Sequence, residues 1–358
     1  MAQSLVGANQ DPDALFNAAF FELARESSQI QSLFVQPRSY PGRTTKLTFA
    51  NGSHYESPNL AIILSSLDGI SNGDDAYSAF FAPSATSSAV ATTNPTSGPT
   101  IPGYPHPVAE SPDGIISGYF LNGTGLEDVA VLVIFSFEPP QVTADTQRQF
   151  QQTLQDFLTS ASSAGKKKLV IDLQTNGGGL TNLGSEAFAQ LFRSMRPNSQ
   201  GNELANAALN AIGITASNIF AGDLATGNYT AQEQDMNPPV VVQGQMTLDQ
   251  KPFASWSAFY GPVEVHGAEF TNLFQTNYSD PLVTDDYSSG LIITGTNNRT
   301  NIGPGQVFEP SNMVLLYDGQ CASTCAFFSE LMKTLGGVQA VAVGGRPQQI
   351  PMQGGKYR

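Results

Sequence analysis

The sequence is poor in charged residues, and the few that it has are mostly acidic. Lys, Arg, Asp and Glu together make up 13% of the 358 residues, well below the roughly one quarter that is usual in soluble domains. Thirty acidic residues against 16 basic ones give a net charge of −14. Such a surface repels nucleic-acid phosphates and anionic lipid, so neither a nucleic acid nor a membrane is an expected partner.

Long hydrophobic runs are also missing. No run approaches the roughly 20 apolar residues that a membrane-spanning helix needs, and the first residues lack the basic segment and apolar core of a signal peptide. The abundance of Ser, Thr, Asn and Gly is nevertheless common in exported proteins. Five N-x-Ser/Thr sequons occur, at Asn51, Asn122, Asn228, Asn277 and Asn298. These features favour a glycoprotein that is secreted or in the secretory pathway, with unused sequons as the alternative.

Cysteine and histidine are scarce. The two cysteines, Cys321 and Cys325, are four residues apart, so their Cα atoms could lie near the roughly 5.5–6 Å that a disulfide prefers. A bridge between them is one interpretation, and a pair of buried thiols is the other. A metal site is not expected, because two cysteines without a nearby histidine do not complete a ligand set. The three histidines, His54, His106 and His266, are interpreted as surface or structural residues.

The first third of the chain contains little that could form a core. Residues 11–24 predict a short helix, and residues 43–64 predict two strands joined at Asn51-Gly52, a strong hairpin dipeptide. Residues 68–115 are rich in Ser, Thr, Ala, Pro and Gly, a composition that predicts a surface loop. This loop is the best candidate for a domain boundary.

The second part of the chain alternates between predicted strands and helices. Apolar runs predict strands at residues 129–137, 167–173, 313–318 and 338–345. Amphipathic segments predict helices at 143–165, before Pro197 and after Ala322, and an Ala-rich helix near 202–212. This alternation is typical of an α/β fold with a largely parallel sheet flanked by helices.

One serine stands at the end of a predicted strand and the start of a predicted helix. Ser323 would therefore project from the carboxyl edge of the sheet, where α/β proteins build their sites. The N–H of Thr324, at the helix start, is a natural donor for an oxyanion. The alternative is that Ser323 only caps the helix.

Three glycines follow another strand in "LVIDLQTNGGGL", which ends at Leu180. Glycines allow a sharp turn and bring a backbone N–H close to a ligand, so one of them could supply a second oxyanion donor. An ordinary glycine turn is the alternative. A phosphate-binding loop is not expected, because no Lys-Ser/Thr pair follows the glycines.

Together, "LVIDLQTNGGG" and "DGQCASTCAFFSELMK" resemble two motifs of the tail-specific (C-terminal processing) serine peptidases, serine peptidase family 41. The family usually has Arg where Gln174 stands, and the resemblance is closest to a fungal, chlamydial-protease-like branch. It implies a crotonase-like catalytic core and the remnant of an N-terminal PDZ-like, β-rich region. The expected domains are a partial PDZ-like region at 1–67, a linker at 68–115 and a catalytic core at 116–358 that is incomplete at its C-terminus.

The resemblance also implies a chemistry. Ser323 would be the nucleophile of an endopeptidase that works through an acyl-enzyme, with the backbone amides of Thr324 and Gly178 as the oxyanion hole. No metal or cofactor would be needed, and the partner would be a peptide or protein substrate. Some fungal relatives lie with genes for ribosomally made peptides, which implies the processing of a precursor peptide.

The sequence departs from the family in its general base. The branch uses a histidine and an orienting glutamate, and no histidine here stands in such a motif. Other branches use a lysine about 25 residues after the serine, but that window holds Arg346 and Gln348, and arginine stays protonated. Lys356 comes too late. The chain is therefore expected to be an incomplete piece that is inactive alone, and an inactive peptide-binding protein of the same fold is the alternative.

Overall fold

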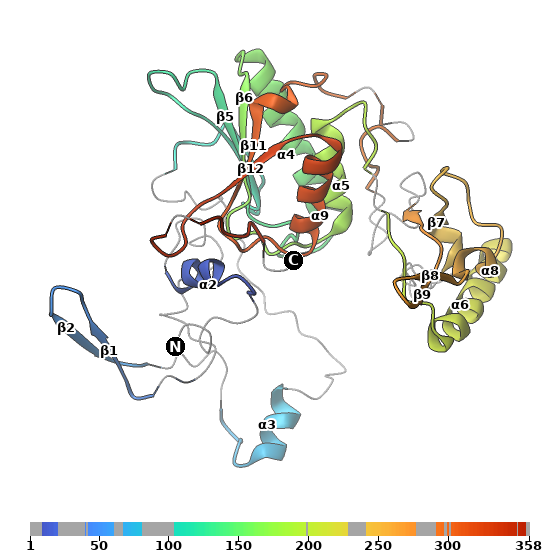
Figure 1. Ribbon diagram of the computed structural model, residues 1–358, viewed down its shortest axis with the longest axis horizontal. Helices are drawn as coiled ribbons and strands as arrows, with labels where there is room; N and C mark the ends of the chain where they lie inside the picture. The colour runs from blue at the N-terminus through green and yellow to red at the C-terminus, as the bar shows by residue number, and fades with distance from the viewer. Residues whose placement is uncertain are drawn as a thin grey trace. The chain divides into compact units, whose positions relative to one another are not determined.

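The structure is a computed structural model and comprises two units, Pro37–Thr96 and the combination of Met1–Gln36 with Ser97–Arg358 (Figure 1). It describes residues 9–20, 40, 42–60, 67–80, 104–197, 200–227, 241–276, 291–296, 299–300, 302–348 and 350–355.

The smaller unit contains a β-hairpin and a short helix. Strands β1 (Thr44–Thr48) and β2 (His54–Pro58) pair antiparallel, which confirms the predicted hairpin, and Gly52 at its turn has φ +82°. Helix α3 (Gly73–Phe80) lies inside the segment predicted to be a loop, so that prediction was wrong for these residues. The side chain of Asn72 accepts the N–H groups of the first helical turn, and this local cap is not visible in the composition.

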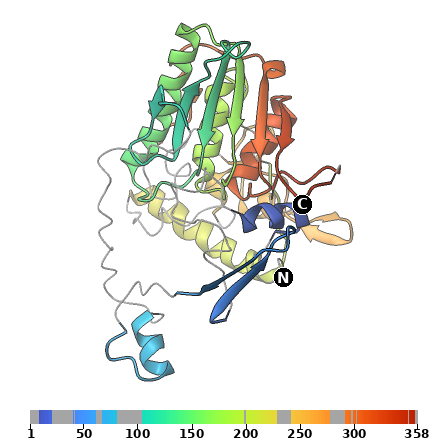
Figure 2. The same ribbon diagram turned by 90° about the vertical axis from the view of Figure 1, so that its left-hand side faces the viewer.

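The larger unit is built on one six-stranded sheet, seen face-on in Figure 2. The strands are β3 (Ala109–Glu110), β4 (Ile116–Phe120), β5 (Val129–Ile134), β6 (Lys168–Asp172), β11 (Met313–Tyr317) and β12 (Gln339–Ala342). Their order is β12-β11-β6-β5-β4-β3. The first four strands of that order run parallel, whereas β4 and β3 are antiparallel additions. The predicted α/β fold with a largely parallel sheet is confirmed.

Helices cover one face of this sheet (Figure 1). They are α4 (Ala144–Ser163), α5 (Thr181–Leu191) and α9 (Thr324–Glu330), the last continued by the π-helical turn η4 (Leu331–Leu335). Their apolar sides and the sheet form one buried core, which includes Phe137, Phe150, Phe157, Phe188, Phe192 and Phe328. Helix α4 buries a single apolar stripe, as its amphipathic pattern predicted. Helix α5 is buried on almost all sides.

The described residues 200–227 and 241–276 contain one long helix and several short elements. They are α6 (Ala207–Thr226), η2 (Val242–Gly244), β7 (Gln245–Met246), α8 (Trp256–Tyr260), β8 (Val263–Val265), β9 (Ala268–Phe270) and β10 (Gln275–Thr276). Trp256 and Phe259 anchor a local apolar cluster there. The Ala-rich helix predicted near 202–212 exists, but it begins and ends later.

The N-terminal helix α2 (Pro12–Ala19) is capped by Asp11, whose side chain accepts the N–H groups of Asp13 and Ala14. It buries Ala14, Leu15 and Ala18. A short turn, η3 (Pro310–Asn312), precedes β11. In the part of the chain that the structure describes, no helix combines the length and apolar character needed to cross a membrane.

Candidate active site

Ser323 lies on a strained turn between β11 and α9. Its backbone has φ 52° and ψ −125°, a region that residues other than glycine rarely adopt. It occupies the N-cap position, but its side chain makes no capping hydrogen bond with α9 and is exposed. The capping alternative therefore does not account for this serine. Strained, exposed serines on strand-to-helix turns are the arrangement of a nucleophile elbow.

Ser323 lies between two cysteines that form a disulfide. Cys321 and Cys325 are bonded, with their Cα atoms 5.3 Å apart. This confirms the predicted bridge, and the alternative of two buried thiols is wrong. The bridge closes a loop of five residues around Ser323, so it restrains the backbone on both sides of the strained residue.

We expect this disulfide to be present in the mature protein. Peptide mapping without reduction, after the alkylation of free thiols, should yield a peptide that contains both cysteines without alkylation. The same digest after reduction is the control, and it should show both cysteines alkylated. Recovery of two alkylated cysteines from native protein would contradict the bridge and weaken the case for export.

The glycine loop after β6, residues 177–179, contacts the turn that carries Ser323. Gly178 and Gly179 have φ values of +108° and +135°, which side-chain-bearing residues rarely adopt. A Cβ atom on Gly178 would lie 2.6 Å from the Cβ of Ser323 and 3.0 Å from the nitrogen of Thr324. The Thr324 hydroxyl also donates a hydrogen bond to the carbonyl of Gly179. The structure thus brings together the two segments that the sequence singled out.

The backbone amides beside Ser323 differ in their partners. Among the described residues, no group accepts a hydrogen bond from the N–H of Thr324. The N–H of Gly178 donates to Asn176 Oδ1 at 2.9 Å, and Asn176 Nδ2 in turn donates to the carbonyl of Ile134. Asn176 therefore orients the glycine loop, and the Gly178 amide must turn from it, or share its hydrogen, to reach an oxyanion.

Two buried carboxyl groups lie beside each other at this edge of the sheet. Asp172 ends β6 and Asp318 follows β11, the neighbouring strand. Burial raises the pKa of Asp172 to about 6, the nearby Asp318 carboxylate also raises it, and a hydrogen bond from the Gln174 N–H opposes the rise. The sequence reasoning missed both residues, although each stands at the end of a predicted strand.

The pKa of Asp172 predicts a pH-dependent stability. Its folded value, about 6, exceeds the ordinary value of 3.8, so ionisation is harder in the folded state and the fold loses stability as pH rises from about 4 to 7. An Asp172→Asn variant avoids this cost, and we expect it to be more stable than wild type by up to about 3 kcal/mol above pH 7. Thermal melts of both proteins between pH 4 and 8 test this. If the melting temperatures of the variant and wild type differed by the same amount at pH 4 and at pH 8, this prediction would be contradicted.

The three histidines are all exposed. His54 lies in β2 with its Nδ1 3.1 Å from the Thr48 hydroxyl, His106 precedes β3, and His266 forms the turn between β8 and β9 with φ 51°. Within the described residues of the larger unit, neither His106 nor His266 makes a hydrogen bond to Ser323. The interpretation of these histidines as surface residues is confirmed.

Arg346 and Gln348, which stand in the window where other branches have a lysine base, both contact the carboxylate of Asp13. Arg346 Nε lies 2.7 Å from Asp13 Oδ1, and Gln348 Nε2 donates to the other oxygen of the same carboxylate. Both side chains therefore fasten the segment after β12 to α2. Lys356 lies outside the described residues; it follows Gly355, whose backbone pairs with Cys321.

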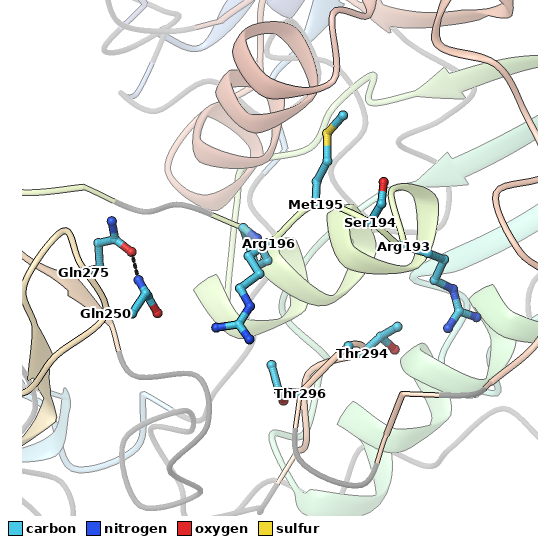
Figure 3. Close-up of a pocket in the computed structure, with 10 residues that line it drawn as sticks. Arg193, Ser194, Met195, Arg196, Gln250, Gln275, Thr294 and Thr296 are labelled. Carbon is cyan, nitrogen blue, oxygen red and sulfur yellow. Dashed lines mark hydrogen bonds between the residues drawn. The ribbon is translucent and has the colours of Figure 1, made fainter.

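A separate pocket of about 130 Å³ lies at the far end of α5 (Figure 3). Arg193, Ser194 and Arg196 line it on one side, and Gln250 and Gln275 line it on the other. Helix α5 starts directly after the glycine loop and has 11 residues, so its far end is roughly 16 Å from that loop at 1.5 Å per residue. The pocket is therefore distinct from the Ser323 site.

Comparison with known proteins gives matches to two family models. The model of peptidase family S41 matches residues 128–348, and that of the CPAF-like PDZ domain matches residues 1–68. The first match includes both the glycine loop and Ser323. The family resemblance noted in the sequence is thereby confirmed, while the domain boundaries stay a prediction.

Similar proteins occur in fungi. The Peptidase S41 family protein ustP of Aspergillus flavus is 32% identical over 273 residues, which are 74% of this chain and 53% of that protein. The Peptidase S41 family protein phomP1 of Diaporthe leptostromiformis is 31% identical over 263 residues, 72% of this chain and 37% of that protein. The chain thus spans about half the length of ustP, or less for phomP1.

Among solved structures, mature CPAF complexed with lactacystin is similar over 94% of this chain and 62% of its own, with 15% identity and a TM-score of 0.39. A putative peptidase from Parabacteroides merdae is similar over 64% of this chain and 42% of its own, with 13% identity and a TM-score of 0.26.

Proposed function

Because the chain belongs to peptidase family S41, we propose that it is a serine endopeptidase that cleaves peptide bonds through an acyl-enzyme on Ser323. The observation that carries this proposal is the strained, exposed serine at φ 52° with the glycine loop packed against it. Strain at a single residue is retained where the surroundings enforce it and function requires it.

In the proposed reaction, Ser323 Oγ attacks the carbonyl carbon of the substrate. A C–O bond forms, the carbonyl oxygen becomes an oxyanion, and the N–H groups of Thr324 and Gly178 stabilise that charge. The C–N bond then breaks and the amine leaves with a proton, which leaves an acyl group on the serine. Water hydrolyses this ester and restores the hydroxyl. No metal or cofactor takes part.

Covalent labelling tests the nucleophile. Protein made from its complete coding sequence is treated with a fluorophosphonate, which phosphonylates activated serines, and the labelled peptide is sequenced by mass spectrometry. We expect the label on Ser323 and none on heat-denatured protein. Labelling of a different serine in the native protein would remove Ser323 from the mechanism.

We further propose that residues 1–358 alone lack peptidase activity. Among the described residues, no group that could accept the serine proton bonds to Ser323, and a positioned base contributes about 10²–10⁴-fold to the rate. The purified 358-residue chain should therefore release no fluorescence from labelled, denatured casein, whereas protein from the complete coding sequence should release it. Serine-dependent cleavage by the 358-residue chain would refute this and make Lys356 and His266 the first variants to test.

The lack of a proton acceptor bonded to Ser323 among the described residues favours one alternative, a catalytically inactive protein of this fold that binds peptides. The two functions separate in a single experiment on protein from the complete coding sequence. A peptidase turns over denatured casein and accepts the fluorophosphonate, whereas a binding protein retains peptides but does neither.

The finer proposal concerns the substrate. Resemblance to the fungal branch supports the processing of a ribosomally made precursor peptide, which would reach the site as an unfolded chain. We therefore expect faster cleavage of unstructured peptides than of folded proteins of the same sequence length, measured by mass spectrometry of the digests. Equal rates on both would count against a precursor peptide as the substrate.

We also propose that the protein passes through the secretory pathway as a glycoprotein. Two of its sequons are exposed in the described ranges, Asn51 in the hairpin turn and Asn122 in a loop after β4, and Asn228, Asn277 and Asn298 lie outside these ranges. The Cys321–Cys325 bridge supports the same compartment, because disulfides persist in oxidising environments. A mobility shift after treatment of the native protein with peptide N-glycosidase is the expected result, and no shift would count against it.

A further inference from the structure

One carboxylate joins the glycine loop to residues 320–323, the proposed nucleophile turn. Asp318 Oδ2 accepts the N–H of Thr175 at 2.8 Å, and Asp318 Oδ1 accepts the N–H of Gln320 at 2.9 Å. Asp318 is 1% exposed, so water does not compete for these bonds. Thr175 begins the turn that leads into the three glycines, and Gln320 begins the turn that leads to Ser323.

Both segments that Asp318 holds are conformationally strained. Thr175 has φ 65° and Ser323 has φ 52°. Three residues beyond each bonded amide, Gly178 and Ser323 lie in contact, and a Cβ added to Gly178 would stand only 2.6 Å from that of Ser323. The relative position of the two proposed oxyanion donors therefore depends on a group that touches neither of them.

Helix α2 makes hydrogen bonds with the segment that contains Asp318 and Gln320. Asn17 Nδ2 donates to the carbonyl of Asp318 at 2.8 Å and to that of Val343 at 2.9 Å. Gln320 Nε2 donates to the carbonyl of Ala14 at 3.1 Å. The backbone of Asp318 is thus held by an element far away in the sequence, so its carboxylate has a defined direction.

We propose that Asp318 is a positioning residue that sets the geometry of the oxyanion hole by binding the glycine loop and the nucleophile turn with its two carboxylate oxygens. This inference rests on the proposed peptidase function. Asp172 provides the contrast, because it is also buried at this edge but accepts a hydrogen bond from Gln174, within its own loop. Asp318 makes the equivalent bond to Gln320 within its own turn, but its second oxygen also accepts the N–H of Thr175, 143 positions away, and so links the two loops.

The test compares Asp318→Asn, Asp318→Ala and the matched control Asp172→Asn, in protein from the complete coding sequence. The rate of fluorophosphonate labelling is measured against probe concentration, which separates the maximal labelling rate from the apparent affinity. The alanine variant loses both acceptors and should label about 10²-fold more slowly, the cost of a misplacement of roughly 1 Å. The asparagine variant keeps one acceptor and should fall between alanine and wild type. Apparent affinity should stay within about threefold, and Asp172→Asn should label like wild type.

Hydrogen exchange of the wild-type protein tests the two hydrogen bonds that Asp318 accepts, without any variant. The amides of Thr175 and Gln320 should exchange slowly, because a buried carboxylate accepts both. Fast exchange of either amide would overturn the proposal, as would a folded Asp318→Asn variant that labels at the wild-type rate. If wild type is not labelled at Ser323 at all, the peptidase function fails. The exchange measurement still decides whether Asp318 binds the amides of Thr175 and Gln320.

Discussion

Replacing Ser323 with alanine should remove measurable peptide hydrolysis. The loss expected for a nucleophilic serine is about 10⁴–10⁶-fold in kcat, because the acyl-enzyme route closes and only binding and oxyanion stabilisation remain. The fold should be unaffected, since alanine at this position keeps the same backbone and the serine hydroxyl makes no capping bond. The measurement is the initial rate of denatured-casein cleavage by protein from the complete coding sequence.

Ser194→Ala is the matched control for that experiment. Ser194 is also exposed, but it lies in the pocket at the far end of α5 and not beside the glycine loop. We expect its variant to cleave casein at the wild-type rate. A Ser323→Ala protein that retains more than about 1% of the activity, or a Ser194→Ala protein that loses it, would contradict the assignment of Ser323 as nucleophile.

The strands and helices that the sequence predicted are those with a simple pattern of burial. Strands β5 and β6 are continuous apolar runs in which most residues are buried. Helix α4 carries one apolar stripe because it packs on the sheet with one side. Strand β4 was missed because it contains Ser117 and Gly118. The glycine is required by packing: a Cβ there would lie 2.1 Å from a ring carbon of Phe157.

The site shows the same division. Local motifs predicted Ser323, Thr324 and the glycine loop, because each depends on residues that are neighbours in sequence. The bond between Asp318 and Thr175 joins residues 143 positions apart, and the contacts of Asn17 span more than 300. No local pattern encodes such partners. The positive φ of Ser323 also depends on tertiary structure, since serine has no intrinsic preference for that region.

Substitution of Gly178 by alanine should be nearly as damaging to activity as the loss of an oxyanion donor, about 10²–10³-fold in kcat. The new Cβ would stand 2.6 Å from the Cβ of Ser323 and 2.7 Å from the carbonyl oxygen of Ala322. Both distances are too short, so the glycine loop or the nucleophile turn must move. The φ of +108° adds backbone strain of roughly 1–3 kcal/mol.

Gly177→Ala separates this steric effect from any general sensitivity of the loop. Gly177 is exposed, no atom lies within 4 Å of the position that its Cβ would take, and its φ lies outside the left-handed region. The alanine variant keeps the backbone N–H and should cleave casein within about threefold of wild type. Both variants are compared by casein cleavage and by thermal melting. If Gly178→Ala retained wild-type kcat, the close packing of the glycine loop on Ser323 would not be needed for catalysis, because the clash would have been relieved without cost to the donors.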